Sequence, residues 1–164
     1  MSLDPEVRAR REAIVVEHME SENRHEFDAT METFDHPRYE IIPTGDVYDG
    51  PEEVAGYYRE TRSAFPDQRN EGAVFWHTDE GVVTEFYLLG TMKGAIRGFP
   101  PTGRSFRVRM TAYFIFAPKG DGIIIERIYF DLYTFLRQIG LLEAAALTGR
   151  EFPADGGIPI EEDR

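Results

Sequence analysis

The 164-residue sequence contains no cysteine, so disulfide bonds, thiolate catalysis and cysteine-ligated metal sites are excluded. Basic residues are few: 18 Lys and Arg stand against 30 Asp and Glu, a formal charge of −12. This balance repels phosphate backbones and anionic lipids, so we expect neither nucleic acid nor a membrane as a partner. No apolar run approaches the roughly 18 residues of a membrane span, and the N-terminus lacks a signal-peptide layout. We therefore expect a cytoplasmic protein.

Common cofactor motifs are also missing. The sequence has no Gly-rich phosphate loop, no dinucleotide-binding fingerprint, no His-Glu-x-x-His and no calcium-loop pattern. None of the four histidines pairs with another at a helical ligand spacing; they are His18, His25, His36 and His77. We therefore expect no metal and no cofactor.

The length suits one domain of roughly 100–200 residues. A hydrophobic content of 41% and an aromatic content of 13% are typical of a folded chain. We expect one α+β domain over residues 1–150. Residues 151–164, with five acids and one Arg, are expected to form a mobile acidic tail.

Helical periodicity predicts helices over about 4–19, 23–34, 51–65 and 132–139. Asp4 before Pro5 is a typical helix start, and Gly140 is well placed as a C-terminal cap. Leu141–Leu147 could add one or two further helical turns.

Between residues 68 and 131 the hydrophobic period changes to about two. This pattern predicts strands over 69–79, 82–93, 105–117 and 123–131, and a short strand at 39–43 closed by a turn at 44–46. Long strands after segregated helices favour a curved antiparallel sheet wrapped around a helix.

The last predicted strand carries the strongest candidate for catalysis. Side chains alternate across a strand, so Arg127, Tyr129 and Asp131 share one face. Desolvation would raise the pKa of Asp131 and make it a usable acid or base, whereas Arg127 would hold it ionised. Asp131 also stands immediately before a predicted helix, where an aspartate N-cap belongs. Asp131 could therefore be either a catalytic acid or base or a helix N-cap.

Several aromatic residues could line a pocket or simply fill the core: Tyr48, Tyr57, Tyr58, Trp76 and Phe86. Asp35 and His36 could form a catalytic pair or a helix-ending turn. His36 and Tyr48 are candidate residues of the pocket mouth.

Motifs in a particular order resemble the SnoaL-like polyketide cyclase (ester cyclase) group of the nuclear transport factor 2-like superfamily. They are Phe65-Pro66-Asp67, Gly90-Thr91-Met92-Lys93-Gly94, Gly98-Phe99-Pro100-Pro101-Thr102-Gly103-Arg104, Asp121-Gly122-Ile123, Glu126, Asp131 and Leu136-Arg137-Gln138-Ile139-Gly140. The resemblance covers about residues 25–142.

The resemblance implies a cone-shaped barrel, in which a curved sheet wraps around three N-terminal helices and leaves an apolar pocket at the open end. It also implies a homodimer packed through the sheet. In this group an aspartate at the position of Asp131 is the acid/base of a cofactor-free ring closure. Met92 and Arg127 stand where the group often has His and Trp, which implies a different, more polar pocket.

The resemblance therefore implies proton abstraction next to a carbonyl, leading to cyclisation or isomerisation of a small apolar molecule. Asp131 would be the acid/base, with Tyr129 and Arg127 stabilising the enolate oxygen. Six side chains are expected to contact substrate: His36, Tyr48, Tyr57, Trp76, Glu85 and Met92.

Two alternatives stay open. One is a ligand-binding or dimerisation module without chemistry, in which Asp131 is only a helix cap. The other resembles an epoxide hydrolase, which needs two carboxylates bridged by an arginine. Asp131, Arg127 and Glu85 would then supply these groups.

Overall fold

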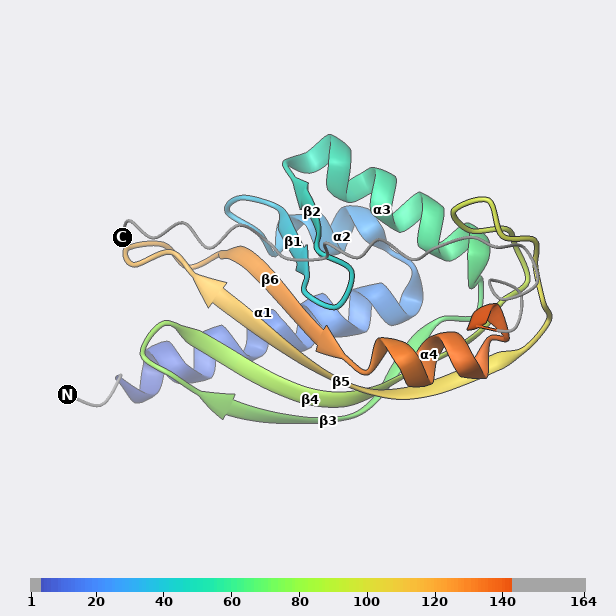
Figure 1. Ribbon diagram of the computed structural model, residues 1–164. Coiled ribbons are helices and arrows are strands. Elements are labelled where there is room, and N and C mark those ends of the chain that lie inside the picture. Colours follow the sequence, from blue (N-terminus) through green and yellow to red (C-terminus); the bar gives the residue numbers. More distant parts are fainter. Residues whose placement is uncertain (1–3, 143–164) are drawn as a thin grey trace.

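The computed structural model describes residues 4–142, which form helices and a six-stranded sheet (Figure 1). In chain order the elements are α1 (Pro5–Arg24), α2 (Phe27–Glu32), β1 (Arg38–Ile41), β2 (Asp46–Asp49), α3 (Pro51–Ala64), β3 (Arg69–His77), β4 (Gly81–Thr91), β5 (Ser105–Phe116), β6 (Ile123–Phe130) and α4 (Leu132–Gln138). The predicted α+β fold is confirmed, with three helices before the long curved strands and a short helix after them. The predicted acidic tail lies outside the described residues.

The strand order in the sheet is β2-β1-β6-β5-β4-β3. The four long strands form the predicted antiparallel meander. The short strand β1 lies parallel to β6, so that Tyr39 is opposite Glu126 and Ile41 is opposite Ile128. β2, which pairs with β1 as a hairpin, was not predicted, because four residues before Gly50-Pro51 give too short a pattern.

The first helix is longer than predicted. Its N-terminus is capped as expected, with the Asp4 carboxylate accepting a hydrogen bond from the Glu6 amide at 2.9 Å. The helix continues past Met19 to Arg24 and ends at His25, which adopts a left-handed φ of 58°. This turn separates α1 from α2, so the predicted helix over 23–34 shortens to Phe27–Glu32.

The core lies between the helices and the inner face of the sheet. Along β5 every second side chain is buried, from Phe106 to Phe116. Full burial of one phenylalanine, valine or methionine side chain contributes roughly 1.5–3 kcal/mol to the free energy of unfolding. On β6 the inner face carries Glu126, Ile128 and Phe130, and the outer face carries Arg127 and Tyr129.

Within residues 4–142, no helix has both the length and the apolar character needed to cross a membrane.

Candidate active site

A cavity of about 570 Å³ opens between α3, α4 and the inner face of the sheet. Its volume lies within the roughly 300–1,000 Å³ of small-molecule sites. Aromatic rings form much of its wall, namely Phe65, Phe99, Phe106, Phe130 and Phe135. An apolar, aromatic wall of this kind suits a largely hydrophobic ligand.

Four polar side chains form a cluster in this wall, namely Thr44, Asp46, Tyr48 and Arg97. Arg97 Nη2 donates to Asp46 Oδ2 at 2.5 Å and to the Tyr48 hydroxyl at 3.3 Å. Thr44 Oγ1 also donates to Asp46 Oδ2, at 2.5 Å. Among the described residues, no hydrogen bond engages Asp46 Oδ1. The carboxylate therefore keeps one oxygen available to a ligand.

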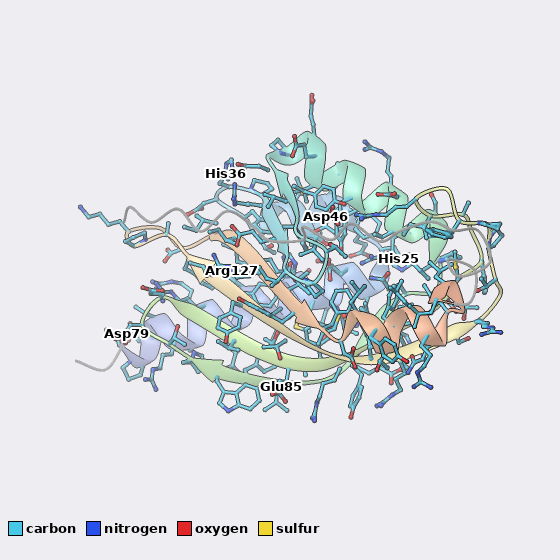
Figure 2. All side chains as sticks on the ribbon, in the orientation of Figure 1. His25, His36, Asp46, Asp79, Glu85 and Arg127 are labelled. Carbon is cyan, nitrogen blue, oxygen red and sulfur yellow. The ribbon has the colours of Figure 1, made fainter. Side chains whose placement is uncertain are left out.

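The cluster is positioned by two tight turns. Asp46, labelled in Figure 2, begins β2 just after the turn of the β1–β2 hairpin, and Tyr48 lies two residues further along this strand. Arg97 lies in a two-residue turn in which Ile96 and Phe99 exchange backbone hydrogen bonds of 3.1 and 2.9 Å. Arg97 has a φ of 49° there, a left-handed backbone conformation that residues other than Gly, Asn and Asp rarely adopt. Such strain is common at ligand sites.

The two tyrosines of the cavity wall keep their hydroxyl protons. Burial raises the pKa of Tyr48, and Asp46 adds to this effect while Arg97 opposes it. Burial also raises the pKa of Tyr57, whose ring lies 4.9 Å from that of Tyr48. Both phenols are therefore neutral hydrogen-bond donors near pH 7.

Asp131 is the N-cap of α4 and does not line this cavity. Its Oδ1 accepts from the Thr134 amide at 3.0 Å and its Oδ2 from the Thr134 hydroxyl at 2.5 Å. These hydrogen bonds lower the pKa of Asp131; the sequence had left open whether desolvation would raise it or Arg127 would lower it. Asp131 therefore acts as a helix cap in this structure. Its acid/base role stays a prediction.

Arg127 and Tyr129 share a face with each other, as predicted, but this is the outer face of the sheet. Arg127 Nε donates to Glu40 Oε2 at 2.6 Å, so Glu40 and not Asp131 is its ion-pair partner. Tyr129 is 40% exposed and packs against Tyr113. Neither side chain reaches the cavity, because alternation along β6 directs Ile128 and Phe130 into it instead.

Of the six side chains expected to contact substrate, Tyr48 and Tyr57 line the cavity and the other four do not. His36 pairs with Asp49 at the surface. Trp76 is 47% exposed on β3, and Glu85 pairs with Arg109 at 3.6 Å on the outer face (Figure 2). Met92 is fully buried in the core.

The epoxide hydrolase-like arrangement is not formed. Arg127 and Glu85 have separate partners, Glu40 and Arg109, and Asp131 is held by its own helix. Within residues 4–142, Arg127 does not bridge Asp131 and Glu85.

A second polar cluster, which sequence reasoning missed, lies inside the cone. His18 on α1 and Glu126 on β6 are both buried, with Nε2 and Oε2 3.0 Å apart. Burial raises the pKa of Glu126, although His18 works against this. Burial disfavours the charged form of His18, but Glu126 raises its pKa above the ordinary value. The signal in the sequence was the spacing of His18 and Glu22, one helical turn apart.

The chain is similar to known proteins in both sequence and fold. A family model described as SnoaL-like polyketide cyclase matches residues 13–139. No curated protein matches the sequence.

Several solved structures share the fold. A candidate polyketide cyclase from Xanthomonas campestris pv. campestris is 19% identical, covers 81% of this chain and 98% of its own, and superposes with a TM-score of 0.73. A candidate SnoaL-like polyketide cyclase from Jannaschia sp. CCS1 is 20% identical, with coverage of 85% and 96% and a TM-score of 0.70. A hypothetical protein with a ketosteroid isomerase-like fold from Catenulispora acidiphila, in complex with trimethylamine, is 21% identical, with coverage of 78% and 92% and a TM-score of 0.66.

Proposed function

Because the chain belongs to the SnoaL-like polyketide cyclase family, we propose that it is a cofactor-independent enzyme that acts on a largely apolar carbonyl compound. The reaction is removal of a proton next to the carbonyl, followed by cyclisation or isomerisation. One observation carries this proposal beyond the family. In a cavity walled mainly by apolar side chains, a carboxylate, a guanidinium and a phenol meet at one place.

Each of these groups has a role in such a reaction. Asp46 takes the proton from the carbon, and the C–H electron pair becomes the enolate, with its charge on oxygen. Arg97 and the Tyr48 hydroxyl stabilise that oxygen by hydrogen bonds. The enolate carbon then attacks a second carbonyl, which closes a ring, and the resulting alkoxide takes the proton back from Asp46. Alternatively, the enolate takes that proton back at another carbon, which isomerises the substrate.

Asp131 remains the competing base, since it is the residue that the family resemblance assigned. In the structure its carboxylate is exposed and bound to Thr134. Its neighbours Phe130 and Leu132 line the cavity, so the two candidate bases lie on the same domain but in different surroundings. An experiment can therefore separate them.

The test measures proton abstraction without knowledge of the product. Apolar β-keto esters and β-diketones are incubated with the protein in D₂O, and NMR follows exchange of the proton next to the carbonyl. Asp46→Asn is expected to slow the enzymatic exchange by roughly 100-fold or more, since a positioned base contributes about 10²–10⁴. Asp131→Asn is expected to retain it. The reverse result would make Asp131 the base.

A second candidate function is binding of a small apolar molecule without turnover. The capping role of Asp131 and the pairing of Asp46 with Arg97 both favour it. It predicts that an apolar fluorescent ligand binds to the cavity while none of the carbonyl compounds exchanges.

We also propose that two copies pair through the outer face of the sheet. Trp76, Val83, Tyr113 and Arg127 form one row across four neighbouring strands. Trp76, Tyr113 and Tyr129 are each at least 40% exposed. Burial of this aromatic surface in a dimer would remove it from water.

A further inference from the structure

The buried cluster between α1, β1 and β6 has no part in the proposed reaction. It contains His18 and Glu22 from α1, Tyr39 from β1 and Glu126 from β6. His18 is 0% exposed and Glu126 is 3% exposed. None of the four lines the cavity. Burial of ionisable groups lowers the stability of a fold through lost hydration, so a cluster of this kind needs an explanation.

Hydrogen-bond counting fixes the tautomer of the neutral His18 ring. The Thr33 hydroxyl donates its single hydrogen to the Thr30 carbonyl at 2.6 Å. It must therefore accept from His18 Nδ1, which lies 2.8 Å away. With the proton held on Nδ1, Nε2 presents its lone pair to the cluster. A second-shell hydrogen bond of this kind is the usual support of a metal-binding histidine.

Three oxygen atoms converge in front of this lone pair, so that the site offers four donor atoms together with His18 Nε2. His18 Nε2 lies 3.0 Å from Glu126 Oε2, 3.0 Å from the Tyr39 hydroxyl and 4.0 Å from Glu22 Oε1. The Tyr39 hydroxyl lies 3.0 Å from Glu22 Oε1. In a tetrahedral site with bonds of about 2.0–2.2 Å, donor atoms are separated by about 3.4 Å. The observed separations bracket that value.

Glu126 supplies the second observation that points to a ligand. Its Oε2 is fully buried and accepts no hydrogen bond of acceptable geometry from the described residues. It nevertheless faces His18 Nε2 at 3.0 Å. A buried carboxylate oxygen without a donor is unusual, and a cation beside it would satisfy it.

We propose that His18, Glu22, Glu126 and Tyr39 form a binding site for a divalent metal ion of zinc type. One imidazole, two carboxylates and a phenol suit zinc better than magnesium, which prefers six oxygen ligands and keeps several waters. Because all four positions are filled by the protein, the site is structural. It ties α1 to the parallel pair of strands β1 and β6, and it leaves the chemistry of the cavity free of metal.

The competing occupant is a proton on His18 Nε2. Arg62 lies 3.8 Å from Glu22, so an imidazolium together with Arg62 would balance the two carboxylates without any metal. Binding of zinc must displace this proton. The experiment therefore has to detect the metal itself.

The test uses the full chain without an affinity tag, freed of metal by a chelator. Zinc is offered both to the folded protein and during refolding, because a fully buried site can load as the chain folds. Wild type is expected to bind one equivalent, measured by competition with a chromophoric chelator. Cobalt in place of zinc is expected to give the visible absorption of a tetrahedral ion. Magnesium is expected not to compete.

Variants assign the binding to the cluster. Glu126→Gln and Glu22→Gln are expected to abolish stoichiometric binding, and Thr33→Val is expected to weaken it roughly 10- to 100-fold through the lost second-shell bond. The matched control is Glu12→Gln, at the part-exposed His77–Glu12 pair with its 2.7 Å contact, which is expected to bind as wild type does. Circular dichroism establishes that each variant is folded; Glu22, at 12% exposure, is the milder change if Glu126→Gln fails to fold.

Two results would overturn the proposal. The first is absence of zinc from the wild type after both routes of loading, which leaves the proton as the occupant. The second is binding that Glu12→Gln removes and the cluster variants keep. Neither result bears on the proton-exchange test of the cavity.

Discussion

Arg97 Nη2 lies 2.5 Å from Asp46 Oδ2, and this contact joins two turns that are 51 residues apart in the chain. Both side chains are partly exposed, at 47% and 29%, and both line the cavity. The pair therefore forms a part of the cavity wall that solvent can reach. In the proposed reaction, the positive charge of Arg97 would stabilise the enolate oxygen.

Arg97→Asn is expected to separate stability from function. Asn tolerates the left-handed φ of 49° better than Arg, so relief of strain should offset the lost ion pair, and stability should change by less than about 1 kcal/mol. Proton exchange of a carbonyl substrate should fall by roughly 10²-fold because the oxygen loses its charged donor. Arg69→Asn is the control, since Arg69 is equally exposed and pairs with Glu71 away from the cavity. Unchanged exchange in Arg97→Asn would remove Arg97 from the mechanism.

Asp131→Ala is expected to lower the midpoint of thermal unfolding, because the Thr134 amide and hydroxyl lose their acceptor. Asp131→Asn should keep most of that stability, since Asn caps a helix about as well as Asp. Asp4→Ala removes the equivalent cap of α1 and is the matched control. If Asp131→Asn unfolds as wild type does but no longer exchanges substrate protons, the acid/base role is right and the cap is incidental.

Asp67 is expected to make stability depend on pH in the acid range. Partial burial would raise its pKa, but hydrogen bonds from the Thr91 amide and hydroxyl, at 2.7 and 2.8 Å, lower it overall. Since the folded pKa lies below the unfolded value of about 3.9, the stabilisation is complete above that value and is lost as the pH falls through the folded pKa.

The measurement compares urea unfolding of wild type and Asp67→Asn from pH 6 down to pH 2. The advantage of wild type should shrink towards low pH. Asp79→Asn is the control, because the Asp79 side chain forms no hydrogen bond or ion pair with the described residues; its position is shown in Figure 2. An advantage that stays constant to pH 2 would contradict the assignment to Asp67.

Trp76→Glu is expected to disrupt the proposed dimer. Trp76 lies in the same row as Tyr113, so a charge there would be buried against an aromatic surface. We expect the dissociation constant to rise by roughly tenfold or more, as for a central interface residue. Light scattering after size-exclusion chromatography measures the mass. Ala13→Glu, at an exposed position of α1, is the control, and a monomeric wild type would contradict the proposal.

The order and kind of the main elements could be predicted from local patterns. The change of period at residue 68 located the meander, and Asp4, Pro5 and Gly140 marked helix ends through their own backbone preferences. The break at His25 was missed because a left-handed histidine has no distinctive local pattern. The parallel pairing of β1 with β6 was missed because it depends on contacts between residues about 87 positions apart.

The sequence by itself determined that Arg127 and Tyr129 share a face, because side chains alternate along any strand. Only the tertiary structure decided which face that is, since the curvature of the sheet and the packing of α1 and α3 settle which side becomes the interior. That choice removed Arg127 and Tyr129 from the cavity and placed Glu126 beside His18. It also brought Asp46 to Arg97, a pairing of two turns that no local pattern specifies.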